Sequence, residues 1–134
     1  MHIESDFNYL AILVAGIAIF VLGGIWYSPA LFAKPWVRLM DKPPARTNMP
    51  LTFLQAFISG LITAYVLAFL LHISRQHSAL SGAHFGAIAW LGFAGAPSYV
   101  TSLFGGERRG LWTINWGYHL ISFIAAGAIL GAWR

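Results

Sequence analysis

Hydrophobic and charged residues are segregated along this chain into long blocks. Four stretches contain no Lys, Arg, Asp or Glu and are predominantly apolar, namely residues 7–28, 51–71, 83–104 and 111–133. A helix needs roughly 20 apolar residues to cross the hydrocarbon core of a bilayer, and each stretch reaches that length. The pattern therefore predicts four membrane spans.

These spans predict an all-α fold, because a single segment in lipid satisfies its own backbone hydrogen bonds only as a helix. Four segments are also too few to close a membrane β-barrel. We expect one domain over residues 1–134, a bundle of four transmembrane helices. The connection after the first span places Phe32 and Trp36 among basic residues, so segment 29–42 is expected to hold a short amphipathic helix at the membrane interface.

The composition excludes an ordinary soluble domain. Hydrophobic residues make up 58% of the chain and charged residues only 9%, whereas soluble domains are about 25% charged. The absence of cysteine excludes disulfides, thiolate catalysis and cysteine metal sites. The net charge of +4 is scattered over the connections between apolar stretches, which is typical of membrane topology. We therefore expect no nucleic-acid partner and no cofactor.

The basic residues also predict an orientation. Six of the eight Lys and Arg residues follow the first or the third span, and only Arg75 and Arg134 lie on the opposite side. Cytoplasmic loops of membrane proteins carry an excess of Lys and Arg. We therefore expect both termini outside the cytoplasm.

The end of the first span carries a family resemblance. Residues 23–36 read Gly-Gly-Ile-Trp-Tyr-Ser-Pro-Ala-Leu-Phe-Ala-Lys-Pro-Trp, and residues 115–118 read Asn-Trp-Gly-Tyr. In these strings the chain resembles the bacterial integral-membrane family called domain of unknown function 1761. The resemblance implies four spans in one small domain of the bacterial inner membrane. It implies no activity, because the family has no established one.

Polar side chains within the spans gather in the halves expected to face the cytoplasm. Gln55 and Ser59 share one face of the second span at spacing i, i+4, and Asn115 and His119 share a face of the fourth. Unpaired polar groups are costly in hydrocarbon, so these faces are expected to meet inside the bundle. We predict a ligand-binding pocket that opens to the cytoplasm near the interfacial segment, lined by Gln55, Ser59, Ser98, Asn115, Tyr118 and His119.

The same residues also allow a purely structural interpretation. Ser and Thr hydroxyls in membrane helices bond readily to their own backbone, and Gln55, Asn115 and His119 would then only hold helices together.

Pro97 removes one helical hydrogen bond, and with Gly92 and Gly95 nearby it predicts a kink in the third span.

Histidines near the other membrane face are candidate metal ligands. His72, His77 and His84 surround the short loop between the second and third spans, and His2 precedes the first span. Imidazole suits zinc, copper or nickel. Their spacing matches no closed metal site, so we predict no metal.

The function that these observations favour is a binding or transport module for a small amphipathic molecule or lipid. Its expected partners are membrane lipids and a second copy of the chain. No nucleophile, zinc-protease or phosphate-loop motif is present, and no pair of carboxylates lies within a span, so no catalytic residue is predicted. Two alternatives stay open, a structural or accessory membrane subunit without a ligand and a membrane enzyme that uses His119 as general base.

Overall fold

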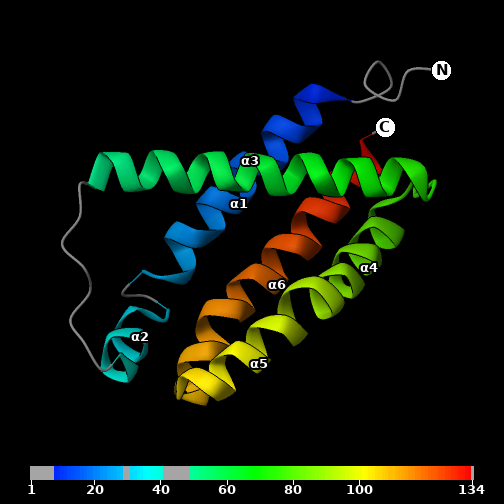
Figure 1. Cartoon of the computed structure of the whole chain (residues 1–134). Helices are drawn as coiled ribbons and strands as arrows, with labels where there is room; N and C mark the ends of the chain where they lie inside the picture. The colour runs from blue at the N-terminus through cyan, green and yellow to red at the C-terminus, as the bar shows by residue number, and fades with distance from the viewer. Residues whose placement is uncertain (1–7, 29–30, 41–48, 134) are drawn as a thin grey trace.

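The computed structural model describes residues 8–28, 31–40 and 49–133. Every regular element in this part of the chain is a helix, which confirms the predicted all-α fold (Figure 1). The elements are α1 (Tyr9–Trp26), α2 (Ala33–Leu39), α3 (Met49–Ile73), α4 (Ala79–Trp90), the π-helix η2 (Leu91–Gly95), α5 (Ala96–Gly105) and α6 (Arg109–Ala132).

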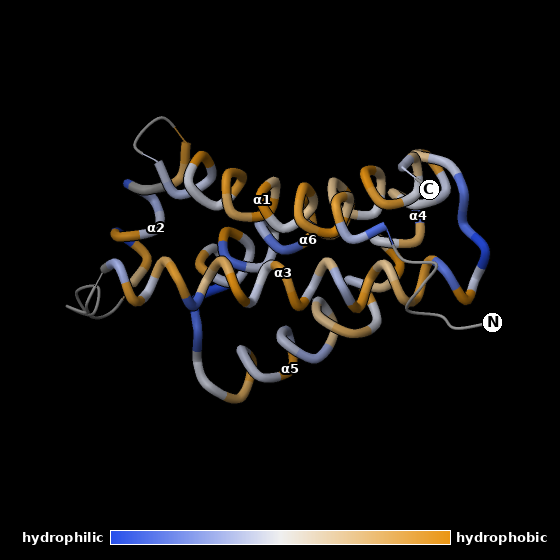
Figure 2. Tube along the Cα trace, turned by 90° about the horizontal axis from the view of Figure 1, so that it is seen from above, coloured by the Kyte–Doolittle hydropathy of each residue, from blue (hydrophilic) through white to orange (hydrophobic). Residues whose placement is uncertain are grey.

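Four helical segments of the described residues are long and apolar enough to cross a membrane. Their bounds lie within a few residues of the predicted stretches, and they comprise Tyr9–Trp26, Pro50–Ile73, Ala79–Gly105 and Arg109–Ala132. Hydrophobic residues dominate these segments, and hydrophilic residues gather at connections such as the turn between α3 and α4 (Figure 2). Large apolar side chains also face outward, among them Leu80, Phe93 and Phe104. Such a surface suits lipid as the surrounding solvent.

Short polar side chains and one glycine define several helix ends. The side chain of Asn8 accepts a hydrogen bond from the backbone N–H of Ala11 and caps α1. Ser78 and Ser81 form a reciprocal capping box at the start of α4. Gly106 adopts a left-handed conformation with φ of 71°, which ends α5.

Helices α4 and α6 lie side by side and pack through glycines (Figure 1). A Cβ added to Gly82 would lie 2.0 Å from the carbonyl oxygen of Gly127, and one added to Gly86 would lie 2.2 Å from that of Phe123. A Cβ on Gly131 would likewise lie 2.3 Å from the carbonyl oxygen of Ser78. The two backbones are therefore in direct contact along a seam that leaves no room for a side chain.

Helix α3 crosses α1 and also contacts α6 (Figure 1). The core among these three helices is built from small and aliphatic side chains, namely Ala11, Ile12, Ala15, Ile19, Ala64, Leu67, Ala68, Leu71, Ala126 and Leu130. The amide of Asn8 donates to the carbonyl oxygen of Trp133, which joins the start of α1 to the end of α6. The α3 residues of this core all come from its C-terminal half, so its N-terminal half is less enclosed.

The third span is not a continuous α-helix. Its middle, Leu91–Gly95, forms a π-helical turn in which the backbone N–H of Ala96 donates to the carbonyl oxygen of Leu91. Pro97 follows directly and has no N–H to continue the α-helical pattern. The disturbance that the sequence predicted near Pro97 thus takes the form of a π-helical turn, a feature found frequently at functional sites.

The predicted segment between the first and second spans contains α2. Trp36 and Tyr27 have ring centroids 5.3 Å apart, and Phe32 and Trp26 have centroids 4.5 Å apart. These aromatic contacts hold α2 against the end of α1. Residues 29–30 and 41–42 of the predicted segment lie outside the described residues.

Candidate functional site

A groove of about 710 Å³ lies where α1, α2, α3 and α6 meet. We call it the tyrosine groove, and its lining residues are Phe20, Gly23, Gly24, Tyr27, Trp36, Thr52, Phe53, Ala56 and Tyr118. It lies at the N-terminal half of α3, the half that contributes no residue to the three-helix core. The groove is therefore a consequence of how α3 crosses α1.

Glycine keeps the α1 wall of the groove open. A Cβ added to Gly24 would meet no atom within 4 Å, so the space beside it is empty. A Cβ on Gly23 would instead lie 3.1 Å from the hydroxyl oxygen of Tyr118. Gly23 thus allows Tyr118 to approach the α1 backbone, and Gly24 leaves room for a ligand.

Two tyrosine side chains line the groove. Tyr27 donates a hydrogen bond of 2.7 Å to Oδ1 of Asn115, and Tyr118 donates one of 2.9 Å to the carbonyl oxygen of Ile19. The two tyrosine rings contact each other edge to face, with centroids 5.8 Å apart. Because each hydroxyl hydrogen is already used, each oxygen keeps only lone pairs to accept hydrogen bonds from a ligand.

The remaining lining is largely apolar. Phe20 packs edge to face against Phe53 across the groove, with ring centroids 6.1 Å apart. Ala56 continues the same wall on α3. The groove is therefore amphipathic, with two tyrosine hydroxyls within a largely hydrocarbon lining.

Helix α2, which contributes Trp36 to the groove, also carries basic side chains. Helix α2 carries Lys34 and Arg38, both exposed, on the same seven-residue helix as Trp36. Residues at spacing i, i+4 share one face of a helix. The two cations therefore share one face of α2, and Trp36, two positions from each of them, lies on another face of the same helix.

Of the six predicted site residues, the structure brings Asn115 and Tyr118 together at the tyrosine groove. Tyr118 lines it, and Asn115 supports it through Tyr27. His119 is half-buried beside the groove, and its ring centroid lies 4.9 Å from those of Trp116 and Tyr118. It is not among the residues that line the groove.

The other three predicted residues lie elsewhere. Gln55 and Ser59 are exposed on α3 and are not among the residues that line the tyrosine groove, although their neighbour Ala56 is. Ser98 lies on α5, where its hydroxyl donates to the carbonyl oxygen of Gly95 and accepts a hydrogen bond of 3.0 Å from Nε1 of Trp112. The six residues therefore do not share a single pocket in the described structure.

Sequence reasoning did not select several residues of the groove as site residues. Gly24 and Tyr27 stood out only as part of the family string, Trp36 was also expected in the interfacial helix, and Thr52 was not singled out. A signal was present, because the string over residues 23–36 places two glycines and two aromatic residues at the end of a span.

The described residues contain no group of three or more His, Cys, Asp or Glu side chains that could hold a metal ion. His72, His77 and His84 belong to this part of the chain, whereas His2 lies outside the described residues.

Fold and groove together define a small multi-pass helical membrane protein. The family model described as "Protein of unknown function (DUF1761)" matches residues 10–131. The chain belongs to this family, and the match confirms the resemblance of residues 23–36 and 115–118. No curated protein and no solved structure matches the chain.

Proposed function

We propose that this protein is a binding or transport module for a lipid or another small amphipathic molecule, and that the tyrosine groove is its binding site. The observation that carries the proposal is the amphipathic groove itself. Phe20, Phe53 and Ala56 offer hydrocarbon to an apolar chain, whereas Tyr27 and Tyr118 offer lone pairs to a polar head. A volume of about 710 Å³ lies in the range of known small-molecule sites, roughly 300–1,000 Å³.

The charge of the surroundings favours an anionic head group. Lys34 and Arg38 are exposed on α2, the helix that carries Trp36, and basic residues near a membrane surface attract anionic lipids. The same excess of basic residues supports an orientation with this end at the cytoplasmic face of the bacterial inner membrane and both termini outside the cytoplasm. We therefore propose that the groove opens toward the inner leaflet.

The exposed polar face of α3 supports self-association. Gln55 and Ser59 are exposed in a helix long enough to span the membrane, where an unpaired amide in hydrocarbon is costly. A second copy could satisfy Gln55 through hydrogen bonds between helices. A bundle this small has little room for a transport path within one protomer, so transport would use such an oligomer.

A structural role is the second candidate, and one observation favours it. Near the groove, Tyr27, Tyr118 and the indole N–H of Trp26 all donate to acceptors within the protein, the last to the carbonyl oxygen of Ile114 at 2.8 Å. Such internal pairing is what helices held together by polar contacts require. In that case the groove would hold only bulk lipid.

Filling the groove tests the proposal. Gly24→Leu adds a side chain to empty space in the groove, and Gly92→Leu adds one to empty space at a position that does not line it. Detergent-solubilised protein would be mixed with dioleoyl phosphatidylglycerol and analysed by native mass spectrometry. We expect wild type and Gly92→Leu to retain the lipid and Gly24→Leu to lose it.

Two outcomes would contradict the binding site. Equal lipid retention by Gly24→Leu and Gly92→Leu would show that lipid binds elsewhere. If wild type retains no lipid, the structural role is favoured. Circular dichroism of each variant checks that the helical content is unchanged.

A further inference from the structure

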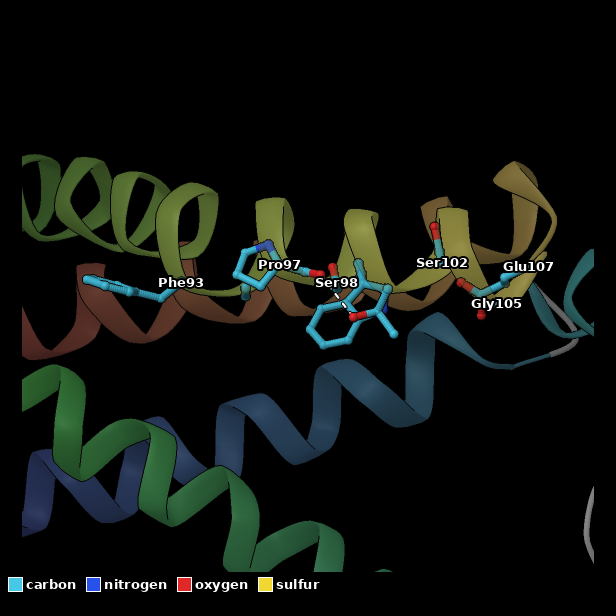
Figure 3. Close-up of a pocket in the computed structure, with 9 residues that line it drawn as sticks. Phe93, Pro97, Ser98, Ser102, Gly105 and Glu107 are labelled. Atoms are coloured by element: carbon cyan, nitrogen blue, oxygen red, sulfur yellow. Dashed lines mark hydrogen bonds between the residues drawn. The ribbon is translucent and has the colours of Figure 1, made fainter.

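A second groove, of about 510 Å³, runs along η2 and α5. Figure 3 shows its labelled residues in a row from Phe93 at one end to Gly105 and Glu107 at the other. We call it the serine groove, and it is lined by Phe93, Ala94, Pro97, Ser98, Thr101, Ser102, Gly105, Glu107 and Trp116. None of these residues lines the tyrosine groove.

The three hydroxyls of this groove all direct their hydrogens to the backbone of α5 and η2. Ser98 donates to the carbonyl oxygen of Gly95 at 3.1 Å, Thr101 donates to that of Pro97 at 3.1 Å, and Ser102 donates to that of Tyr99 at 2.9 Å. A hydroxyl has one hydrogen and two lone pairs. Ser98 already accepts a hydrogen bond from Nε1 of Trp112 and Ser102 is buried, whereas Thr101 is exposed. The row therefore offers its remaining lone pairs, and no donor, to a ligand.

A carboxylate ends the row. Glu107 is half-buried in the turn after α5, and within the described residues its side chain forms no hydrogen bond or ion pair. Arg109, two positions later, is held elsewhere: it donates to the hydroxyl of Tyr99 and lies over that ring, 5.2 Å from its centroid. An ionised carboxylate accepts hydrogen bonds and donates none. Its negative charge is thus available to a cation in the groove.

The rest of the lining suits the apolar part of a ligand. Phe93 is 79% exposed, and Ala94 and Pro97 continue its hydrocarbon surface. Trp116 adds an aromatic face from α6, and such faces attract ammonium groups. An apolar wall beside acceptors and one negative charge is complementary to a molecule with a cationic end and a hydrocarbon end.

We propose that the serine groove binds an organic ammonium, whose N–H groups donate to Glu107 and to the hydroxyl oxygens of α5 while its apolar part lies against Phe93 and Pro97. An alcohol of the same length lacks the positive charge and offers only one donor. An anionic amphiphile would meet the like charge of Glu107 and hydroxyls whose hydrogens are already donated. This site is separate from the tyrosine groove, so the proposal does not depend on the function proposed above.

The probe for the experiment is octylammonium, with octan-1-ol as the neutral ligand of equal chain length. The full chain would be placed in phosphatidylcholine nanodiscs, and binding measured by isothermal titration calorimetry after subtraction of empty nanodiscs. We expect octylammonium to bind at least about tenfold more tightly than octan-1-ol, since hydrogen bonds to charged groups are worth about twice neutral ones. Equal affinity for the two, or no binding of octylammonium, would overturn the proposal.

Two pairs of variants locate the binding. Glu107→Gln keeps the shape and removes the charge, and Asp41→Asn removes an equal charge from another part of the chain. Gly105→Leu fills the serine groove at a position where a Cβ meets nothing within 4 Å, and Gly92→Leu is its control in equally open space. We expect Glu107→Gln and Gly105→Leu each to weaken octylammonium binding by about tenfold or more, and both controls to bind as wild type.

The outcomes separate clearly. Unchanged binding in Glu107→Gln would exclude the carboxylate as the counter-ion and contradict the proposal. If Glu107→Gln does not fold, Gly105→Leu alone tests the proposal. This variant fills the groove without changing its charge, so it must also weaken octylammonium binding. If Gly105→Leu and Gly92→Leu weaken octylammonium binding equally, the loss comes from a change in the membrane or in the fold and not from the serine groove. That result would also contradict the proposal.

Discussion

Tyr27 donates a hydrogen bond of 2.7 Å to Oδ1 of Asn115, a residue 88 positions later in the chain. This bond joins the end of the first span to the start of the last. A second one, from Tyr118 to the carbonyl oxygen of Ile19, joins the same two helices further along. Together they hold α1 and α6 in a fixed relation and leave the space toward the start of α3 open.

Removing the first bond is expected to lower stability. Tyr27→Phe deletes the donor and leaves Oδ1 of Asn115 without it, and we expect a loss of about 0.5–1.5 kcal/mol in the free energy of unfolding. The measurement is chemical unfolding in detergent micelles. A double-mutant cycle that combines Tyr27→Phe with Asn115→Leu isolates the free energy of this hydrogen bond. Strictly additive effects would show that the two residues are not coupled.

The glycine seam between α4 and α6 predicts a larger effect. Gly82→Ala would place a Cβ 2.0 Å from the carbonyl oxygen of Gly127, where only backbone could move. We expect a destabilisation of about 1–3 kcal/mol, the usual cost of overpacking, measured by thermal unfolding in detergent.

The matched control for the seam is Gly24→Ala, because a Cβ at Gly24 meets nothing within 4 Å. Replacing an exposed helical glycine by alanine is expected to be neutral or to stabilise by up to about 1 kcal/mol. Equal midpoint temperatures of thermal unfolding for Gly82→Ala and Gly24→Ala would mean that α4 and α6 do not touch at the seam.

Cysteine labelling tests the proposed orientation, and the chain has no native cysteine to interfere. Asp41→Cys lies in the connection proposed to be cytoplasmic, and His77→Cys lies in the exposed turn on the opposite side. In spheroplasts, which are bacterial cells stripped of their outer membrane, a membrane-impermeant maleimide is expected to label position 77 and not position 41. Permeabilised cells, the control, should show labelling of both. The reverse pattern in intact spheroplasts would invert the topology.

Self-association through α3 predicts a response to Gln55→Leu. If a second copy satisfies the exposed amide, losing it should weaken dimerisation about three- to eighteenfold, since a hydrogen bond between membrane helices is worth roughly 0.6–1.7 kcal/mol. Energy transfer between labelled copies in liposomes measures the change. Thr101→Val, which removes an exposed hydroxyl from α5, is the control and should have no effect. A dimer insensitive to Gln55→Leu would place the interface elsewhere.

The candidate site was predictable only in part. Asn115 and Tyr118 were identified because polar side chains are rare in a membrane span and need partners. Their actual partners, Tyr27 and Ile19, come from another span, and one is a backbone carbonyl oxygen. Gln55 and Ser59 were expected beside them because their depth in the membrane is similar. Depth, however, says nothing about the direction in which a helix face points.

The sequence alone determined the four spans, the all-α fold and the family. These features depend on local properties, namely uncharged length against the thickness of a bilayer and a recognisable string at residues 23–36. Only the tertiary structure decided which polar residues meet. In lipid no hydrophobic force turns an apolar helix toward its neighbours, so its rotation follows from close contacts of small residues, such as Gly82 with Gly127. The packing of α3 through its C-terminal half then opened the tyrosine groove and left Gln55 facing outward.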